Sequence, residues 1–173
     1  MTKRVRELFR LSNDFLGDLL TGTQVFYTFQ LPPFASLRTD PSTAAGIDRI
    51  CVFHLVLTLS KWAELYDRYQ AVIPPAVRPE AKDLRKAIDA RGVRGLRNRY
   101  VGHVWDKKLK RPLTEPEFTL DLERVVGPGI LAFMRWINDP EVTDHSGTVV
   151  GIVEHVRDAL RSANGFTDAD LLT

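Results

Sequence analysis

The chain has 173 residues, and 24 Lys and Arg nearly balance 22 Asp and Glu, for a formal net charge of +2. A chain of this length can bury a core without a metal or a disulfide, and its one cysteine, Cys51, excludes a disulfide framework or thiolate metal cluster within the chain. The longest apolar run surrounds Cys51 and falls short of the ~18 residues that cross a bilayer. We therefore expect one cytoplasmic domain covering residues 1–173, with no membrane segment.

Helical periodicity begins at the N-terminus. Apolar residues recur at three- and four-residue spacing between residues 2 and 20. This pattern predicts an amphipathic helix and differs from the unbroken apolar stretch of a secretory signal. We expect Gly22 to bend or end this helix and Pro32-Pro33 to stop whatever follows, because proline cannot donate a backbone hydrogen bond.

The second predicted helix is the most apolar one. Asp40-Pro41 has the pattern of an N-cap followed by proline in the first turn, and the helix should run to about Tyr69. Its centre is apolar on nearly every side, so we place it in the middle of a bundle. His54 is then expected to be a packed, hydrogen-bonded core histidine rather than a ligand.

A third helical region opens near Pro79 and extends to Val104, with Gly92 and Gly95 as points of bending or close approach. A fourth begins just before Phe118, because Thr114 and Glu117 have the spacing of a capping box.

The interruption Gly127-Pro128-Gly129 is expected to split or kink the fourth helix. A last helix should run from about Ser146 to Ala163, with Gly165 just past its end. The whole pattern predicts an all-α bundle of about five helices.

Positive charge is concentrated in one segment. Residues 91–111 hold eight basic residues and one acid, Asp106, so the segment carries +7 and the rest of the chain −5. Such a patch suits a polyanion, because it concentrates phosphate at one place; a solvated basic loop is the alternative. The residues assigned to RNA binding are Arg94, Arg99, Lys107, Lys108, Lys110 and Arg111.

The same segment places one arginine unusually. On a straight α-helix with 100° per residue, Arg97 falls at the edge of an apolar stripe and His103 flanks the opposite edge. A guanidinium on an apolar edge is costly unless it meets a carboxylate, a carbonyl or a phosphate. The stripe consists of Val93, Leu96, Tyr100 and Val104.

Arg97 and His103 together suit cleavage of RNA without a metal. Histidine can move protons at neutral pH, and arginine can hold two phosphoryl oxygens while staying charged. On one straight helix the two side chains point about 120° apart, roughly 9 Å apart along the axis. One copy therefore converges poorly on a phosphate, whereas a two-fold homodimer could surround a shared cleft. An ordinary ion pair and a locally packed histidine are the alternative.

The sequence Leu96-Arg97-Asn98-Arg99-Tyr100-Val101-Gly102-His103 resembles the signature of the HEPN superfamily, in particular its abortive-infection branch of U type. That signature is an Arg followed by a polar residue, usually Asn or Asp, and then a His, with four to six residues between Arg and His. Arg97, Asn98 and His103 match it in order and spacing.

The resemblance implies a helical bundle that dimerises through its motif helices, often a metal-independent endoribonuclease acting as a toxin or in phage defence, with an antitoxin as possible partner. It implies catalytic roles for Arg97 and His103, an orienting role for Asn98, and no metal or cofactor. Trp105 stands where members paired with nucleotidyltransferase antitoxins carry Tyr, so nucleotide transfer onto the motif is not implied.

Two other functions fit the same basic segment. One is a non-catalytic helical module that binds RNA, a nucleotide or a partner protein. The other is an antitoxin-like or scaffolding subunit whose basic segment meets an acidic partner.

Overall fold

The computed structural model describes residues 3–101, 106, 109–167 and 170. Over these residues the backbone forms seven α-helices and no strand beyond an isolated bridge between Asp106 and Arg111. The all-α prediction is confirmed, whereas the predicted number of about five helices is too low. The helices are α1 (Lys3–Thr28), α2 (Pro41–Tyr69), α3 (Arg78–Ala90), α4 (Val93–Leu96), α5 (Glu115–Val126), α6 (Ile130–Ile137) and α7 (Val149–Asn164).

Three shorter turns join these helices. The 3₁₀ turn η1 (Phe34–Arg38) lies between α1 and α2, and η2 (Gln70–Val72) follows α2. The third, η3 (Arg97–Val101), is π-helical and continues directly from α4.

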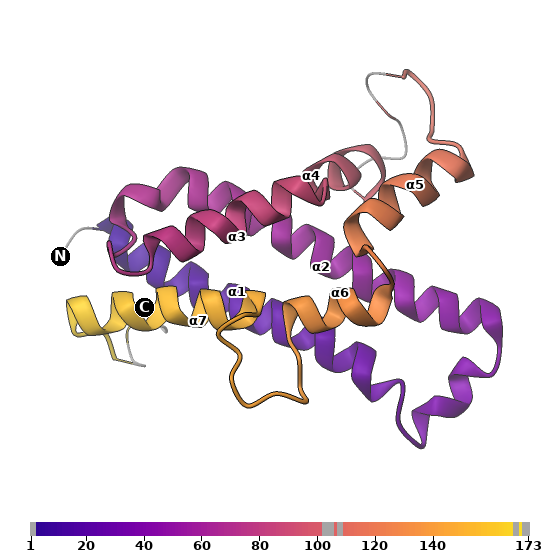
Figure 1. Cartoon of the computed structure of the whole chain (residues 1–173), viewed down its shortest axis with the longest axis horizontal. Helices are drawn as coiled ribbons and strands as arrows, with labels where there is room; N and C mark the ends of the chain where they lie inside the picture. Colours follow the sequence, from indigo (N-terminus) through magenta and orange to yellow (C-terminus); the bar gives the residue numbers. More distant parts are fainter. Residues whose placement is uncertain (1–2, 102–105, 107–108, 168–169, 171–173) are drawn as a thin grey trace.

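The two longest helices form the frame of the bundle (Figure 1). α1 packs against α2 and also against α7, while α3, α4 and η3 lie along α2. The start of α1 and the end of α7 lie at the same end of the bundle, where the Phe9 and Phe166 rings stack at 4.5 Å. The predicted central position of the most apolar helix is confirmed, because Leu55, Leu59 and Trp62 of α2 are completely buried.

Helix ends follow the predicted caps. The Asp40 carboxylate accepts a hydrogen bond of 2.7 Å from the backbone N–H of Thr43, and Thr114 and Glu117 form the predicted capping box. Gly165 follows α7 with a φ of 67°, the left-handed conformation that favours glycine after a helix.

Gly22 does not bend or end the first helix, so that prediction is wrong. α1 continues to Thr28, and Gly22 is buried where His54 and Leu55 of α2 approach it. A glycine is needed there because a Cβ atom would lie only 2.8 Å from both side chains. His54 Nε2 donates a hydrogen bond of 2.8 Å to the Asp18 carbonyl oxygen, which confirms its hydrogen-bonded packing role.

Two glycine-rich breaks account for the higher helix number. Gly92 has a φ of 71° and separates α3 from α4. Gly127 and Gly129 also have positive φ values, 76° and 153°, and together with Pro128 they separate α5 from α6. Since left-handed backbone and a missing N–H both interrupt the helical hydrogen-bond pattern, each predicted long helix becomes two.

One helical stretch, Pro41–Val72, is long and apolar enough to cross a membrane by length and composition alone. Core helices of soluble proteins can meet the same two criteria. In this fold it contributes buried residues to the central core. The cytoplasmic location remains a prediction.

Gly151 provides a test of the packing at the start of α7. A methyl group there would overlap the carbonyl group of His145, whereas at Gly17 of α1 it would meet no atom. We expect Gly151→Ala to lower the free energy of unfolding by roughly 1–3 kcal/mol through overpacking. Gly17→Ala, the matched control, should raise it by up to about 1 kcal/mol, because alanine favours helix. Urea unfolding followed by circular dichroism measures both, and equal stability of the two variants would contradict the packing argument.

Candidate functional site

The predicted straight helix through the motif is wrong. The α-helix ends at Leu96, and residues 97–101 are π-helical. A π-helix bonds residue i to i+5, so each residue turns by less than 100° and the angles expected beyond Leu96 no longer hold. Val93 and Leu96 are buried as predicted and Tyr100 is partly buried, while Gly102, His103, Val104 and Trp105 lie outside the described residues.

Arg97 lies near a carboxylate, one of the partners expected for a guanidinium at the edge of the apolar stripe. Its side chain is 40% exposed. Its Nη1 atom donates a hydrogen bond of 2.9 Å to Asn98 Oδ1 and lies 3.7 Å from Glu64 Oε1 of α2, whose side chain is 56% exposed. Arg97 is therefore held on one side and faces solvent on the other.

Arg94 and Arg111 are each paired with carboxylates. Arg94 contacts Asp89 at 3.1 Å and Asp67 at 3.4 Å. Arg111 makes a two-pronged contact with Glu117, both hydrogen bonds being 2.8 Å. This guanidinium, followed by the N–H and hydroxyl of Thr114, holds the pKa of Glu117 well below its usual range.

Arg99 joins two carboxylates from different parts of the chain. Its Nε donates to Asp106 at 2.8 Å and its Nη1 to Asp121 of α5 at 2.7 Å. The Asp106 side chain is only 4% exposed, and its Oδ1 also accepts from the backbone N–H of Leu109. The hydrogen bond to Asp106 raises the pKa of Arg99. Through its second contact, with Asp121, this arginine anchors the motif segment to α5.

Arg91, at the start of the basic segment, is also engaged. Its guanidinium lies 4.2 Å from the centre of the Trp136 ring, and its Nη1 donates a hydrogen bond of 2.9 Å to the Val125 carbonyl. Burial lowers its pKa. Arg91 thus connects the end of α3 to α5 and α6.

The structure therefore separates the six residues assigned to RNA binding. Arg94, Arg99 and Arg111 have carboxylate partners, Lys110 is exposed, and Lys107 and Lys108 lie outside the described residues. Their assignment to RNA binding stays a prediction. No group of three or more His, Cys, Asp or Glu side chains that could hold a metal occurs among the described residues.

Tyr100 connects the motif segment to a cluster of aromatic rings. It stacks on Phe118 of α5 at 4.0 Å with 28° between the rings, and its edge meets Phe53 of α2 at 5.5 Å. Phe53 and Phe118 contact each other at 6.1 Å. These two phenylalanines also line a cavity.

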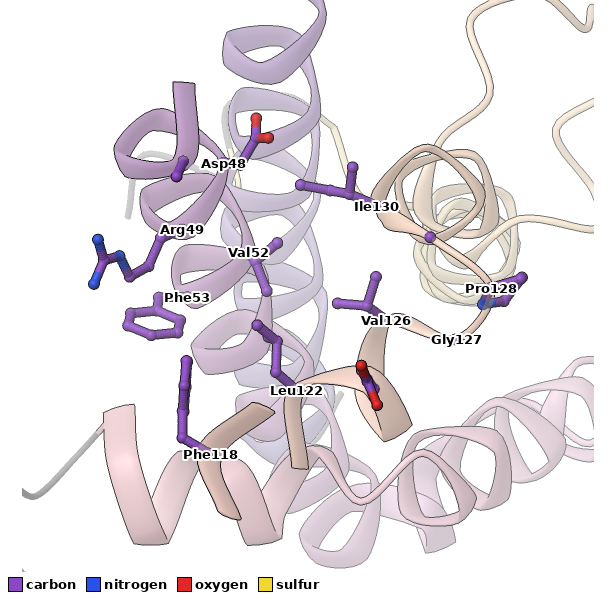
Figure 2. A pocket seen from close by; sticks show the side chains of 13 residues that line it. Asp48, Arg49, Val52, Phe53, Phe118, Leu122, Val126, Gly127, Pro128 and Ile130 are labelled. Carbon is purple, nitrogen blue, oxygen red and sulfur yellow. The ribbon is translucent and has the colours of Figure 1, made fainter. Parts of the chain in front are cut away.

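The cavity is a groove of about 580 Å³ between α2, α5 and the start of α6 (Figure 2). Its walls are mostly apolar, and Val52, Leu122 and Ile130 project into it from three helices. Gly127-Pro128-Gly129 forms one end, where the chain turns from α5 to α6. Two exposed charged residues line it, Arg49 and Glu123. The third charged lining residue, Asp48, is partly buried and pairs with Arg38 at 2.7 Å.

Neither the groove nor the role of Glu64 was directly predictable from the sequence. The groove is built from residues about 70 positions apart, and periodicity reports only neighbours on one element. The one local signal is the predicted break at Gly127-Pro128-Gly129, which supplies the turn at the end of the groove. Glu64 is an acid in a strongly apolar helix, and this could have marked it as a partner for a basic group.

Comparison with known proteins gives a structural neighbour and no family. No protein-family model and no curated protein matches this chain. The fold is similar to that of integron cassette protein Vpc_cass2 from the mobile metagenome of V. paracholerae, with a TM-score of 0.68 and 26% sequence identity over 92% of this chain and 97% of that one. That description gives a genetic origin and states no activity. The resemblance to HEPN proteins remains a prediction.

The two central arginines should differ in their effect on stability. Arg99→Gln leaves buried Asp106 without its guanidinium, and we expect a loss of about 2 kcal/mol in the free energy of unfolding, less than for a fully buried pair because Arg99 is partly exposed. Arg97→Gln should lose less than about 1 kcal/mol, since its partner is exposed. Urea unfolding of both variants measures the difference, and a larger loss for Arg97→Gln would contradict this assignment.

Glu117 should make stability depend on pH. Because the pKa of Glu117 is depressed in the folded chain, its contribution is complete above the unfolded pKa of about 4.3 and is lost as the pH falls toward the folded pKa. Glu117→Gln keeps a capping-box side chain and removes the ion pair with Arg111. We expect a lower Tm than wild type at pH 7 and a smaller gap at pH 3, measured by thermal unfolding. A gap that widens on acidification would contradict the sign of this linkage.

Proposed function

We propose that this protein is a metal-independent endoribonuclease in which Arg97 binds the reacting phosphate and His103 transfers protons. The observation that carries the proposal is the state of Arg97. Its described contacts both involve Nη1, so Nε and Nη2 make no hydrogen bond within the described part of the chain. A guanidinium with two free donors on one edge can hold two phosphoryl oxygens.

The neighbouring arginines support this assignment by contrast. Arg94, Arg99 and Arg111 each lie 3.1 Å or less from a carboxylate oxygen, whereas the Glu64 oxygen is 3.7 Å from Arg97. The motif arginine is therefore the more available to an anion. Asn98, at 2.9 Å, fixes the side of the guanidinium turned away from that anion.

The proposed reaction needs no group beyond these side chains. The ribose 2′-oxygen attacks phosphorus as its proton passes to histidine, and the bond to the 5′-oxygen breaks as that oxygen gains a proton. The products are a 2′,3′-cyclic phosphate and a 5′-hydroxyl. Arg97 would stabilise the charge on the phosphoryl oxygens, and His103 would act as the proton carrier.

The homodimer is part of the proposal. Ile50 and Leu57 of α2 are 70% and 37% exposed, and they lie on the same face of the helix as Glu64, the partner of Arg97. An apolar surface beside the motif suits contact with a second copy, which could bring a second Arg97 and His103 to the cleft. An antitoxin that covers the same site would restrain the enzyme.

A non-catalytic module that binds RNA, a nucleotide or a partner protein is the second candidate function, and the groove beside the motif favours it. A cavity of about 580 Å³ with mostly apolar walls has the size and character of a ligand site. Such a module would use Arg97 for binding alone.

Cleavage of total RNA in excess chelator distinguishes the two functions. We expect the wild-type chain to leave 2′,3′-cyclic phosphate ends, and Arg97→Ala and His103→Ala to cut at least about 100-fold more slowly. Lys86→Ala, which removes an exposed charge from α3, is the matched control and should cut normally. Folding of each variant is checked by circular dichroism. If folded wild-type protein binds RNA but does not cleave it, the enzyme hypothesis is rejected in favour of the binding module.

A further inference from the structure

The groove described above presents a flat aromatic wall. Tyr100 covers one face of the Phe118 ring at 4.0 Å, and Phe118 also lines the groove. With Tyr100 on one face, a ring that enters the groove can reach only the other face or the edge of Phe118. An aromatic face with a stacked ring behind it is a platform for another planar ring, since stacking of a base on an aromatic side chain tolerates any base.

A positively charged side chain lies at the edge of this groove. Arg49 is exposed, and no hydrogen bond or ion pair holds it within the described residues. Figure 2 shows its side chain extending from α2, with the guanidinium at the outer side of the groove. A planar apolar group could enter the groove while an attached phosphate stays in solvent at Arg49.

The acid in the groove wall sets the orientation of such a ligand. Glu123 is exposed and also lines the groove, on α5 four residues before the Gly127 turn into α6, whereas Arg49 is on α2. Its carboxylate repels phosphate and can accept a hydrogen bond from an exocyclic amino group. Both charges therefore favour a base inside and a phosphate on the side of Arg49.

The groove and the motif lie along one face of α2. Phe53 and Glu64 are 11 residues apart, which is three turns and about 20°, or roughly 16 Å along the axis. Tyr100 contacts Phe53 and Arg97 contacts Glu64, so the motif segment lies over both positions. A strand with one phosphate at Arg97 could place a base in the groove a few nucleotides away.

We propose that this groove binds an unpaired nucleobase of the RNA strand that Arg97 engages, with the base on Phe118 and its phosphate at Arg49. The substrate is then single-stranded RNA, because a paired base cannot leave its stack without breaking the pair. This inference rests on the proposed function for the identity of the strand. The geometry of the groove itself does not depend on catalysis.

The test uses the full chain and a short 2′-O-methyl RNA that carries one 2-aminopurine. Methylation blocks the attacking oxygen, so binding is measured without cleavage. We expect quenching of the base fluorescence on binding, and an affinity about tenfold higher than for the same strand with an abasic site. A fully paired duplex should bind without quenching.

Three variants locate the base. Phe118→Leu keeps an apolar wall and removes the flat face, so it should weaken binding about tenfold and abolish quenching. Arg49→Gln should weaken binding and reduce the slope of log affinity against log salt by about 1. Leu120→Ala is the control on the same helix, because Leu120 is 68% exposed and outside the groove. All variants are checked for unchanged circular dichroism and Tm.

Two results would overturn the inference. One is equal affinity for the base-containing and abasic strands; the other is unchanged quenching with folded Phe118→Leu. Binding of an apolar dye gives a third readout. If the dye binds the wild-type groove, is lost in Phe118→Leu and is not displaced by saturating RNA, the groove belongs to an apolar partner instead. Cleavage measured in parallel separates the proposals: cleavage without quenching removes only the base site, and quenching without cleavage removes only the catalytic role.

Discussion

The arrangement of the motif depends on the contact of Arg99 with Asp106 and Asp121. Asp106 is almost completely buried, and a buried carboxylate is stable only with hydrogen-bond and charge partners. Arg99 supplies a charge partner and a hydrogen bond to Asp106, and at the same time it reaches Asp121 of α5, 22 residues further along the chain. The contact fixes the motif segment against α5, and the directions of the neighbouring residues follow from it. Arg97 reaches α2, and Tyr100 lies between Phe53 and Phe118.

The arginines of the basic segment differ in their structural roles, although they are close together in the sequence and were predicted to form one patch. Arg91 lies over Trp136, Arg94 and Arg111 pair with acids, and Arg99 anchors the segment. All these acids except Asp106 come from outside the segment, so acids elsewhere in the folded chain offset the charges of Arg94, Arg99 and Arg111. Attraction of a polyanion would then depend on Arg97, on exposed Lys110 and on Arg49 outside the segment, and less on the number of basic residues.

The sequence predicted what is decided locally. The cap at Asp40, the capping box of Thr114 and Glu117 and the end of the last helix at Gly165 each depend on residues within one turn, and all three are present. Gly22 was misjudged because its role is set by α2, whose His54 and Leu55 approach it. The same limit applies to the site.

Periodicity assumes an ideal α-helix, so the π-helical turn after Leu96 and the exposure of Arg97 could not be derived from it. The groove depends on the packing of α2 against α5 and α6, which no single element encodes. What the spacing did indicate was the identity of the residues for which we propose the chemistry. Their directions required the tertiary contacts.

Tyr100 is the residue that makes the motif and the groove one surface. It belongs to the π-helical segment of Arg97, and its ring supports the groove wall at Phe118. A ligand on Phe118 would therefore rest on the segment that orients Arg97, without an intervening loop. Because protein interiors are close-packed, a change in the position of Phe118 requires Tyr100 to move or to lose contact. Occupation of the groove and the direction of the motif arginine would thus be governed by the same packing, whether a strand bound there were cut or only held.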